Sequence, residues 1–108
     1  MKILGIIPAR GGSKRIPGKN IKKFCGQPLI AWSIKSALKS NLDRVIVSTE
    51  DKETAKVSKK YGAEVPFIRP KNLAGDKVGI EPVIRHGLEW LKENEGYVPD
   101  AVALLMPT

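Results

Sequence analysis

Six basic residues are gathered in one short stretch near the start of the chain, IPARGGSKRIPGKNIKKF at residues 7–24, which contains no acidic residue. Gly11, Gly12 and Gly18 allow the backbone to approach a ligand closely and to turn N–H groups toward it. The arginine and lysine side chains add positive charge, and a serine adds a hydroxyl donor. These residue types together predict a loop that binds phosphate groups.

The loop differs from the two common phosphate-binding motifs. Five residues, not four, separate Gly12 from Gly18, and Asn20 stands where a Walker A motif has Ser or Thr. The dinucleotide pattern Gly-x-Gly-x-x-Gly does not occur. The plain alternative is a flexible, solvated basic loop. Two prolines stiffen this stretch, at positions 8 and 17, and three glycines shape it, which favours a binding loop.

The positive charge of the chain is unevenly distributed. The net charge is +8 over 108 residues, and residues 1–42 hold nine Lys and Arg with no Asp or Glu. Residues 43–108 hold ten basic and eleven acidic residues. A local excess favours a site for a small polyanion over a generally basic surface. A nucleic-acid-binding module remains the alternative because the pI is near 9.8, but the basic residues are not interleaved with aromatic ones.

Composition sets the broad class of the protein. A hydrophobic fraction of 42% within 108 residues is typical of one globular domain. Cys25 is the single cysteine, so no internal disulfide forms, and this agrees with a reducing compartment. The apolar start precedes its charges, which is the wrong order for a signal peptide, and no segment reaches the ~20 apolar residues that span a bilayer. We expect a cytoplasmic protein that is not bound to a membrane.

Strand and helix patterns alternate along the chain. Residues 3–7 and 44–48 are short apolar runs that predict buried strands. Helices are expected from Pro28 to about Asn41, with Leu38 on the buried face, from Asp51 to Tyr61, and from Pro82 onward. Such alternation predicts an α/β fold in which a mainly parallel sheet has helices on both faces. In such sheets ligands bind at the carboxyl ends of strands, where the basic loop begins.

The last apolar run, residues 101–106, is expected to be a central strand because it has no polar face. The sequence stops two residues later, at Pro107 and Thr108, and a central parallel strand is an unusual place for a chain to end. We therefore expect residues 1–108 to be the truncated N-terminal half of a longer protein. Of the remaining side chains, Asp51 is expected to favour a helix N-terminus, and His86 to be a partly packed surface residue and not a base.

The stretch from Ile7 to Asn20 resembles the N-terminal nucleotide-binding signature of the acylneuraminate cytidylyltransferases, the CMP-sialic acid synthetases, whose branches include the pseudaminic and legionaminic acid enzymes. The likeness covers nearly the whole chain and about the first half of a typical family member. It continues in the blocks Val45–Thr49, Tyr61–Pro66, Arg69–Pro70, Leu73–Ala74, Asp76, Leu104–Leu105 and Pro107–Thr108. The resemblance implies a Rossmann-like fold of the nucleotide-diphospho-sugar transferase kind, with residues 1–108 as the nucleotide-binding half of one cytidylyltransferase domain.

The resemblance also implies a reaction, in which CTP and an acidic nine-carbon sugar give the CMP-sugar and pyrophosphate. Arg10 and Lys19 are the expected catalytic contacts to the triphosphate. The other expected substrate-binding residues are Ala9, Gly11, Gly12, Ser13, Lys14, Asn20, Arg69 and Asp76. Arg69 matches an arginine near the cytosine, or is a surface base held extended by Pro70. Asp76 matches an acid of the family, or begins a helix.

The resemblance further implies Mg²⁺, held by aspartates beyond residue 108, and a homodimer when full length. The 108-residue chain alone is therefore expected to lack activity. Three positions depart from the family pattern. Lys77 and Ile80 replace small hydroxylic residues, and Met106 replaces a glutamine that faces the sugar, so the identity of the sugar stays open. Another sugar nucleotidyltransferase, for example one that activates Kdo, is the alternative within the same class.

Overall fold

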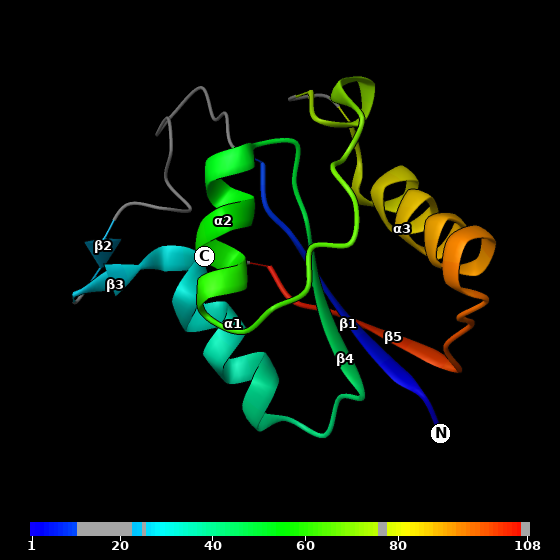
Figure 1. Ribbon diagram of the computed structural model, residues 1–108, viewed down its shortest axis with the longest axis horizontal. Coiled ribbons are helices and arrows are strands. Elements are labelled where there is room, and N and C mark those ends of the chain that lie inside the picture. The colour runs from blue at the N-terminus through cyan, green and yellow to red at the C-terminus, as the bar shows by residue number, and fades with distance from the viewer. Residues whose placement is uncertain (11–22, 25, 76–77, 107–108) are drawn as a thin grey trace.

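The computed structural model describes residues 1–10, 23–24, 26–75 and 78–106, and Figure 1 shows their arrangement. Within these residues the main sheet has three parallel strands in the order β4-β1-β5, which confirms the mainly parallel α/β fold. The strands are β1 (Ile3–Pro8), β4 (Arg44–Ser48) and β5 (Ala101–Leu104). The helices are α1 (Leu29–Lys39), α2 (Lys52–Lys60), the short 3₁₀ helix η1 (Lys71–Leu73) and α3 (Ile80–Glu95).

Helices cover both faces of this sheet, with α1 and α2 on one side and α3 on the other (Figure 1). Each face has its own apolar core because successive side chains of a strand point to opposite faces. Ile7 and Val47 pack toward α1 with Ile30 and Ile34. On the other face the buried cluster contains Leu4, Ile6, Ile46, Phe67 and Leu91. None of the described helices is long and apolar enough to cross a bilayer.

An aspartate caps α2, glycines follow α2 and α3, and one side chain of α1 differs from its predicted burial. Asp51 caps α2, since its carboxylate accepts hydrogen bonds from the backbone N–H and the hydroxyl of Thr54 at 2.9 and 2.7 Å. Gly62 follows α2 with a φ of 101°, and Gly96 ends α3 with a φ of 66°, a region that favours glycine. Leu38, which the helical pattern placed on the buried face of α1, is instead 51% exposed.

Two short features lie beside these elements. Strands β2 (Lys23–Phe24) and β3 (Gln27–Pro28) pair antiparallel through a turn in which Gly26 has a φ of 86°, and this hairpin was not expected from the sequence. Glu64 lies beside β4 and pairs with it through a single parallel bridge to Ile46.

The sequence predicted β5 as a central strand of a longer protein, and the described residues supply a neighbour on one side of it. It pairs with β1 along one side only and forms an edge of the described sheet, while β1 is the central strand. The side chains of Val102 and Leu104 are 36% and 42% exposed, and Met106, just beyond the strand, is 50% exposed. A wholly apolar strand therefore lies at a sheet edge with much of its surface uncovered.

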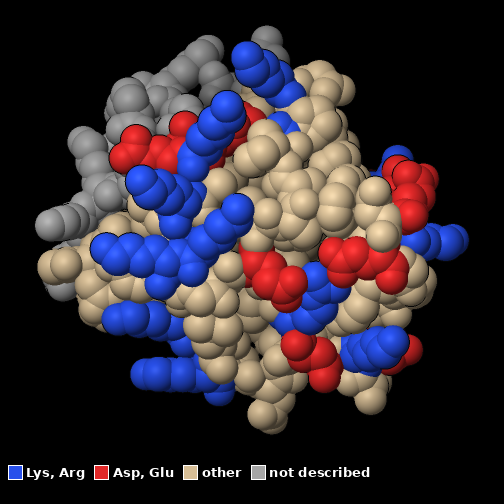
Figure 2. Space-filling model, viewed as in Figure 1, with Lys and Arg blue, Asp and Glu red and all other residues tan. Residues whose placement is uncertain are grey.

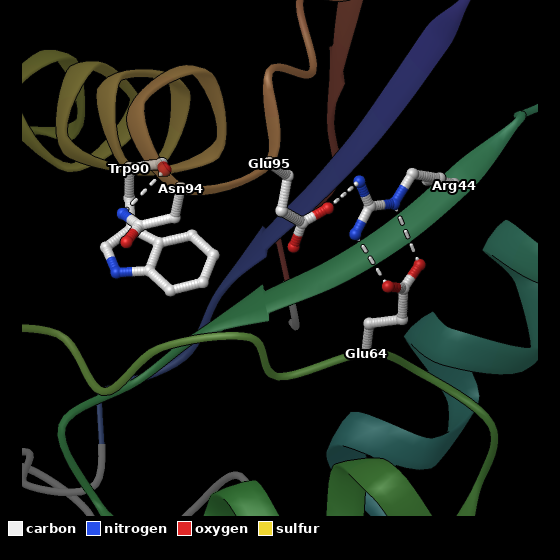
Figure 3. Close-up of polar contacts among 5 residues, drawn as sticks. All are labelled: Arg44, Glu64, Trp90, Asn94 and Glu95. Carbon is white, nitrogen blue, oxygen red and sulfur yellow. Dashed lines mark hydrogen bonds and ion pairs between the residues drawn. The ribbon is translucent and has the colours of Figure 1, made fainter.

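At the amino-terminal end of β4, the side chain of Arg44 joins three parts of the chain: the start of β4, the segment that holds Glu64, and the end of α3 (Figure 3). Its guanidinium donates two hydrogen bonds to Glu64, at 3.0 and 2.6 Å, and one to Glu95, at 2.9 Å. The guanidinium carbon lies 4.6 Å from the centre of the Tyr97 ring. The hydrogen bond to Glu64 contributes most to raising the pKa of Arg44, against the opposing effect of burial. Arg44 thus links the start of β4 to the end of α3.

We expect replacement of Arg44 by Ala to lower the free energy of unfolding by about 1–2 kcal/mol, because a planar, bidentate and partly buried ion pair is lost. Arg85 offers a matched control, since its ion pair with Glu81 lies within one helix and both side chains are largely exposed. Replacement of Arg85 by Ala should change the free energy by less than about 0.5 kcal/mol. Urea unfolding followed by circular dichroism measures both, and equal losses would show that the Arg44 cluster has no special role.

The exposed edge of β5 predicts that the chain associates with itself. Exposed apolar side chains beside an unpaired strand edge favour edge-to-edge contacts. In sedimentation equilibrium the average mass of the wild-type chain should rise with concentration. Changing both Val102 and Leu104 to Lys should reduce that rise, whereas Leu38→Lys on the exposed side of α1 should not. A wild-type chain that stays monomeric at every concentration would contradict this prediction.

Candidate functional site

The carboxyl ends of β1 and β4 lie together because the two strands are parallel and in register, with Pro8 opposite Ser48. The backbone N–H of Ala9 donates to the Ser48 carbonyl at 2.9 Å, which extends the pairing one residue past β1. Ala9 is buried, and Arg10 is half-buried. The basic loop thus leaves the sheet at this edge, which we call the carboxyl edge and define by residues 8–10 and 48–51.

A third segment brings Arg69 to the carboxyl edge. The backbone N–H of Arg69 donates to the Thr49 carbonyl at 2.8 Å. Its guanidinium donates from Nε to the Ser48 hydroxyl at 3.1 Å and from Nη2 to the Ser48 carbonyl at 2.6 Å. A longer contact of 3.4 Å joins Nη1 to the Leu73 carbonyl in η1. Only 3% of the surface of Arg69 is exposed, so the sequence-based alternative of a surface base is wrong.

The charge of Arg69 is buried among neutral hydrogen-bond acceptors. In the described part of the chain these acceptors are one hydroxyl and two carbonyl oxygens. Burial lowers the pKa of the guanidinium, the negative charge of Glu50 opposes this effect, and the positive charge of Arg10 adds to it. Arginine nevertheless keeps its proton in proteins. Glu50 supplies negative charge to Arg69 at this edge, and an anionic ligand would add to it.

The turn after β4 is fixed by its own side chains. Thr49 is fully buried, and its hydroxyl accepts a hydrogen bond from the backbone N–H of Asp51 at 3.1 Å. Asp51 in turn caps α2, as expected from the sequence. Because the Asp51 carboxylate already accepts two hydrogen bonds from Thr54, its place in the structure is explained by helix capping. This turn holds Ser48 and Thr49 in the orientation that Arg69 requires.

Helix α3 borders the same region through His86. The imidazole contacts the ring of Phe67 edge-on, with 4.9 Å between the ring centres, and the ring centre of Trp90 lies 5.4 Å from that of Phe67. Burial lowers the pKa of His86, the positive charge of Arg69 lowers it further, and Glu89 opposes both. His86 is half-buried, which agrees with the expectation of a partly packed residue, and its Nδ1 has no hydrogen-bond partner among the described residues.

The structure brings Arg69 close to Ala9 and Arg10, although at least 59 sequence positions separate Arg69 from either of them. The other expected site residues lie outside the described residues: Gly11, Gly12, Ser13, Lys14, Lys19, Asn20 and Asp76. Sequence reasoning did not single out Ser48, which holds Arg69 through two atoms. The pattern that could have indicated Ser48 is a single hydroxylic residue directly after the apolar residues Val45–Val47.

Charged side chains are unevenly spread over the surface of the described residues. Figure 2 shows lysines and arginines gathered over α1 and α2, whereas both signs are mixed on the side of α3. The exposed basic residues of these two helices are Lys35, Lys39, Lys52, Lys56, Lys59 and Lys60. Among the residues that the structure describes, no group of three His, Cys, Asp or Glu side chains could hold a metal ion. The described residues therefore do not provide a metal-binding set.

Comparisons with known proteins agree with this fold. The cytidylyltransferase family model matches residues 4–93. The chain is 48% identical to the pseudaminic acid cytidylyltransferase of Campylobacter jejuni over 109 aligned positions, which cover 100% of this chain and 47% of that protein. It is 42% identical to the CMP-N,N'-diacetyllegionaminic acid synthase of Legionella pneumophila, with the same coverage of each chain.

A solved structure of CMP:2-keto-3-deoxy-manno-octonic acid synthetase, complexed with CTP, has a TM-score of 0.77 and 25% identity to this chain. The similarity covers 99% of this chain and 40% of that one. The chain thus spans about half the length of the curated relatives that it matches. Because the family model matches most of the chain and the relatives align along all of it, the chain belongs to the cytidylyltransferase family.

Proposed function

We propose that residues 1–108 form the nucleotide-binding part of a CTP-dependent cytidylyltransferase that activates a nonulosonic acid. The single observation that carries this proposal is the buried cation at the carboxyl edge, where Arg69 has neutral partners and lies close to the charge of Arg10. An anionic triphosphate would add to the negative charge that Glu50 already brings to Arg69. The names of the relatives support CTP as that nucleotide.

The reaction transfers a cytidylyl group. The anomeric hydroxyl of the sugar forms a bond to the α-phosphorus of CTP and loses its proton, while the bond from this phosphorus to the bridging oxygen of the β-phosphate breaks. Negative charge builds up on the departing pyrophosphate. Fixed cations placed at that position lower the barrier, because their orientation is established before the reaction begins.

Individual roles follow from position. We assign Arg10 and Lys19 to the triphosphate, with Gly11 and Gly12 as backbone donors and Ala9, Ser13, Lys14 and Asn20 as further contacts. We assign Arg69 to the nucleotide, near the cytosine, and Asp76 to a further contact with the substrate. A Mg²⁺ ion would supply further charge stabilisation, and we expect its ligands outside this chain. Accordingly, the 108-residue chain alone should bind CTP without releasing pyrophosphate.

The relatives also narrow the proposed sugar. Identity is 48% to the pseudaminic acid enzyme and 42% to the legionaminic acid enzyme, both along the whole chain, against 36% over 82% of the chain to the 3-deoxy-manno-octulosonate (Kdo) cytidylyltransferase of Aliivibrio fischeri. We therefore favour an acidic nine-carbon sugar over Kdo, and Met106 would alter how that sugar is held. A homodimeric full-length enzyme in the cytoplasm completes the proposal.

We predict that Arg10→Ala and Lys19→Ala each weaken CTP binding by this chain about tenfold or more, because each removes a charge-assisted contact. In an enzyme of full family length the same changes should lower turnover by about 10²–10³. Lys59→Ala, on the exposed face of α2, removes the same charge far from the carboxyl edge and should leave CTP affinity unchanged. Calorimetric titration measures the binding, and thermal unfolding checks that each variant folds.

The alternatives have distinct outcomes in the same titration. Tighter binding of another nucleoside triphosphate would indicate a different sugar nucleotidyltransferase. Binding of long RNA or DNA that weakens steeply with salt, without any binding of CTP, would indicate a nucleic-acid-binding module. Unchanged CTP affinity in both loop variants would remove the basic loop from the site.

A further inference from the structure

Ser48 is the one hydroxylic residue of β4, whose other members are Arg44 at the strand start and Val45, Ile46 and Val47 in the core. Its side chain is fully buried. Packing alone would be satisfied by an apolar residue at this position, and a buried hydroxyl has a cost unless it forms a hydrogen bond. The partner that it has is the guanidinium of Arg69.

Ser48 contacts the guanidinium with two atoms. Its hydroxyl accepts from Nε at 3.1 Å and its carbonyl accepts from Nη2 at 2.6 Å. Because Nε and Nη2 belong to one planar group, two acceptors on the same residue fix the orientation of that plane. Of the five N–H groups of arginine, these bonds and the contact to Leu73 use three within the described part of the chain, which leaves one on each terminal nitrogen for a ligand.

The same carbonyl oxygen also accepts the N–H of Ala9 at 2.9 Å. The Ser48 carbonyl therefore contacts both the segment that leads into the basic loop and the buried cation. Any rotation of the guanidinium away from Ser48 changes its position relative to Arg10. The charge of Arg10 already acts on Arg69, so the relative placement of these two cations sets the charge that a ligand meets.

We infer that Ser48 is a positioning residue, whose side-chain hydroxyl holds the Arg69 guanidinium in the orientation that binds the anionic nucleotide at the carboxyl edge. This inference rests on the proposed function for the identity of the ligand. The backbone carbonyl is present in every variant, so the contribution specific to serine is the hydroxyl. A residue that keeps the hydroxyl should therefore keep the function, and one that lacks it should not.

The test compares Ser48→Ala, which removes the hydroxyl, with Ser48→Thr, which keeps it. Ser58→Ala is the matched control, because Ser58 is equally buried and its hydroxyl donates to the Thr54 carbonyl inside α2. In calorimetric titration with CTP, Ser48→Ala should bind about tenfold more weakly than wild type, since a hydrogen bond to a charged group is lost. Ser48→Thr and Ser58→Ala should bind within about twofold of wild type.

A double-mutant cycle with Arg69→Ala separates positioning from general structural damage. If Ser48 acts through Arg69, Ser48→Ala should weaken CTP binding by less than about twofold in the Arg69→Ala background. A tenfold effect in that background would show that the hydroxyl acts elsewhere and would overturn the inference. Unchanged CTP affinity in Ser48→Ala with Arg69 intact would overturn it as well.

A measurement without ligand keeps this inference distinct from the proposed function. The Nε–H proton of Arg69 should give a slowly exchanging signal in ¹⁵N NMR spectra of wild type and Ser48→Thr, and the signal should exchange faster in Ser48→Ala. If the wild-type chain binds no CTP, the proposed function of this chain fails and the nucleotide part of the inference fails with it. The NMR comparison then still decides whether Ser48 positions Arg69, and equal exchange in all variants would refute that role.

Discussion

The parallel pairing of β1 with β4 and β5 is the constraint on which the rest of the structure depends. Parallel strands end at the same edge of a sheet, so the segments that follow β1 and β4 must begin side by side. The bond from Ala9 to the Ser48 carbonyl is a direct result of that register. Helices on both faces then bury the strands, which leaves the carboxyl edge as the place where polar groups gather.

Arg44 and Arg69 lie at opposite ends of the strands and differ in how their charges are compensated. At the amino-terminal edge Arg44 is surrounded by the carboxylates of Glu64 and Glu95, so its charge is compensated within the protein. At the carboxyl edge Arg69 is more deeply buried and its hydrogen-bond partners in the described residues are neutral. The first arrangement stabilises the fold. In the second, Glu50 offsets part of the cost of burying the charge, and an anionic ligand would offset more of it.

Much of the fold follows from local patterns in the sequence. The apolar strands β1 and β4 and the place of Asp51 at the start of α2 were predicted, because each depends on neighbouring residues. The exposure of Leu38 could not be predicted, since it depends on what packs against α1 from elsewhere in the chain. Arg69 was expected as a site residue, but its contact with Ser48 joins residues 21 positions apart, which no local pattern specifies.

We expect the carboxyl edge of the sheet to bind the triphosphate of CTP. A crystal structure of this chain grown with CTP tests it most directly. We predict electron density for CTP at the ends of β1 and β4, with the triphosphate within hydrogen-bond distance of Arg10, the nucleotide in contact with Arg69, and Arg69 still held by Ser48. Density for CTP on the lysines of α1 and α2, with none at the carboxyl edge, would contradict it.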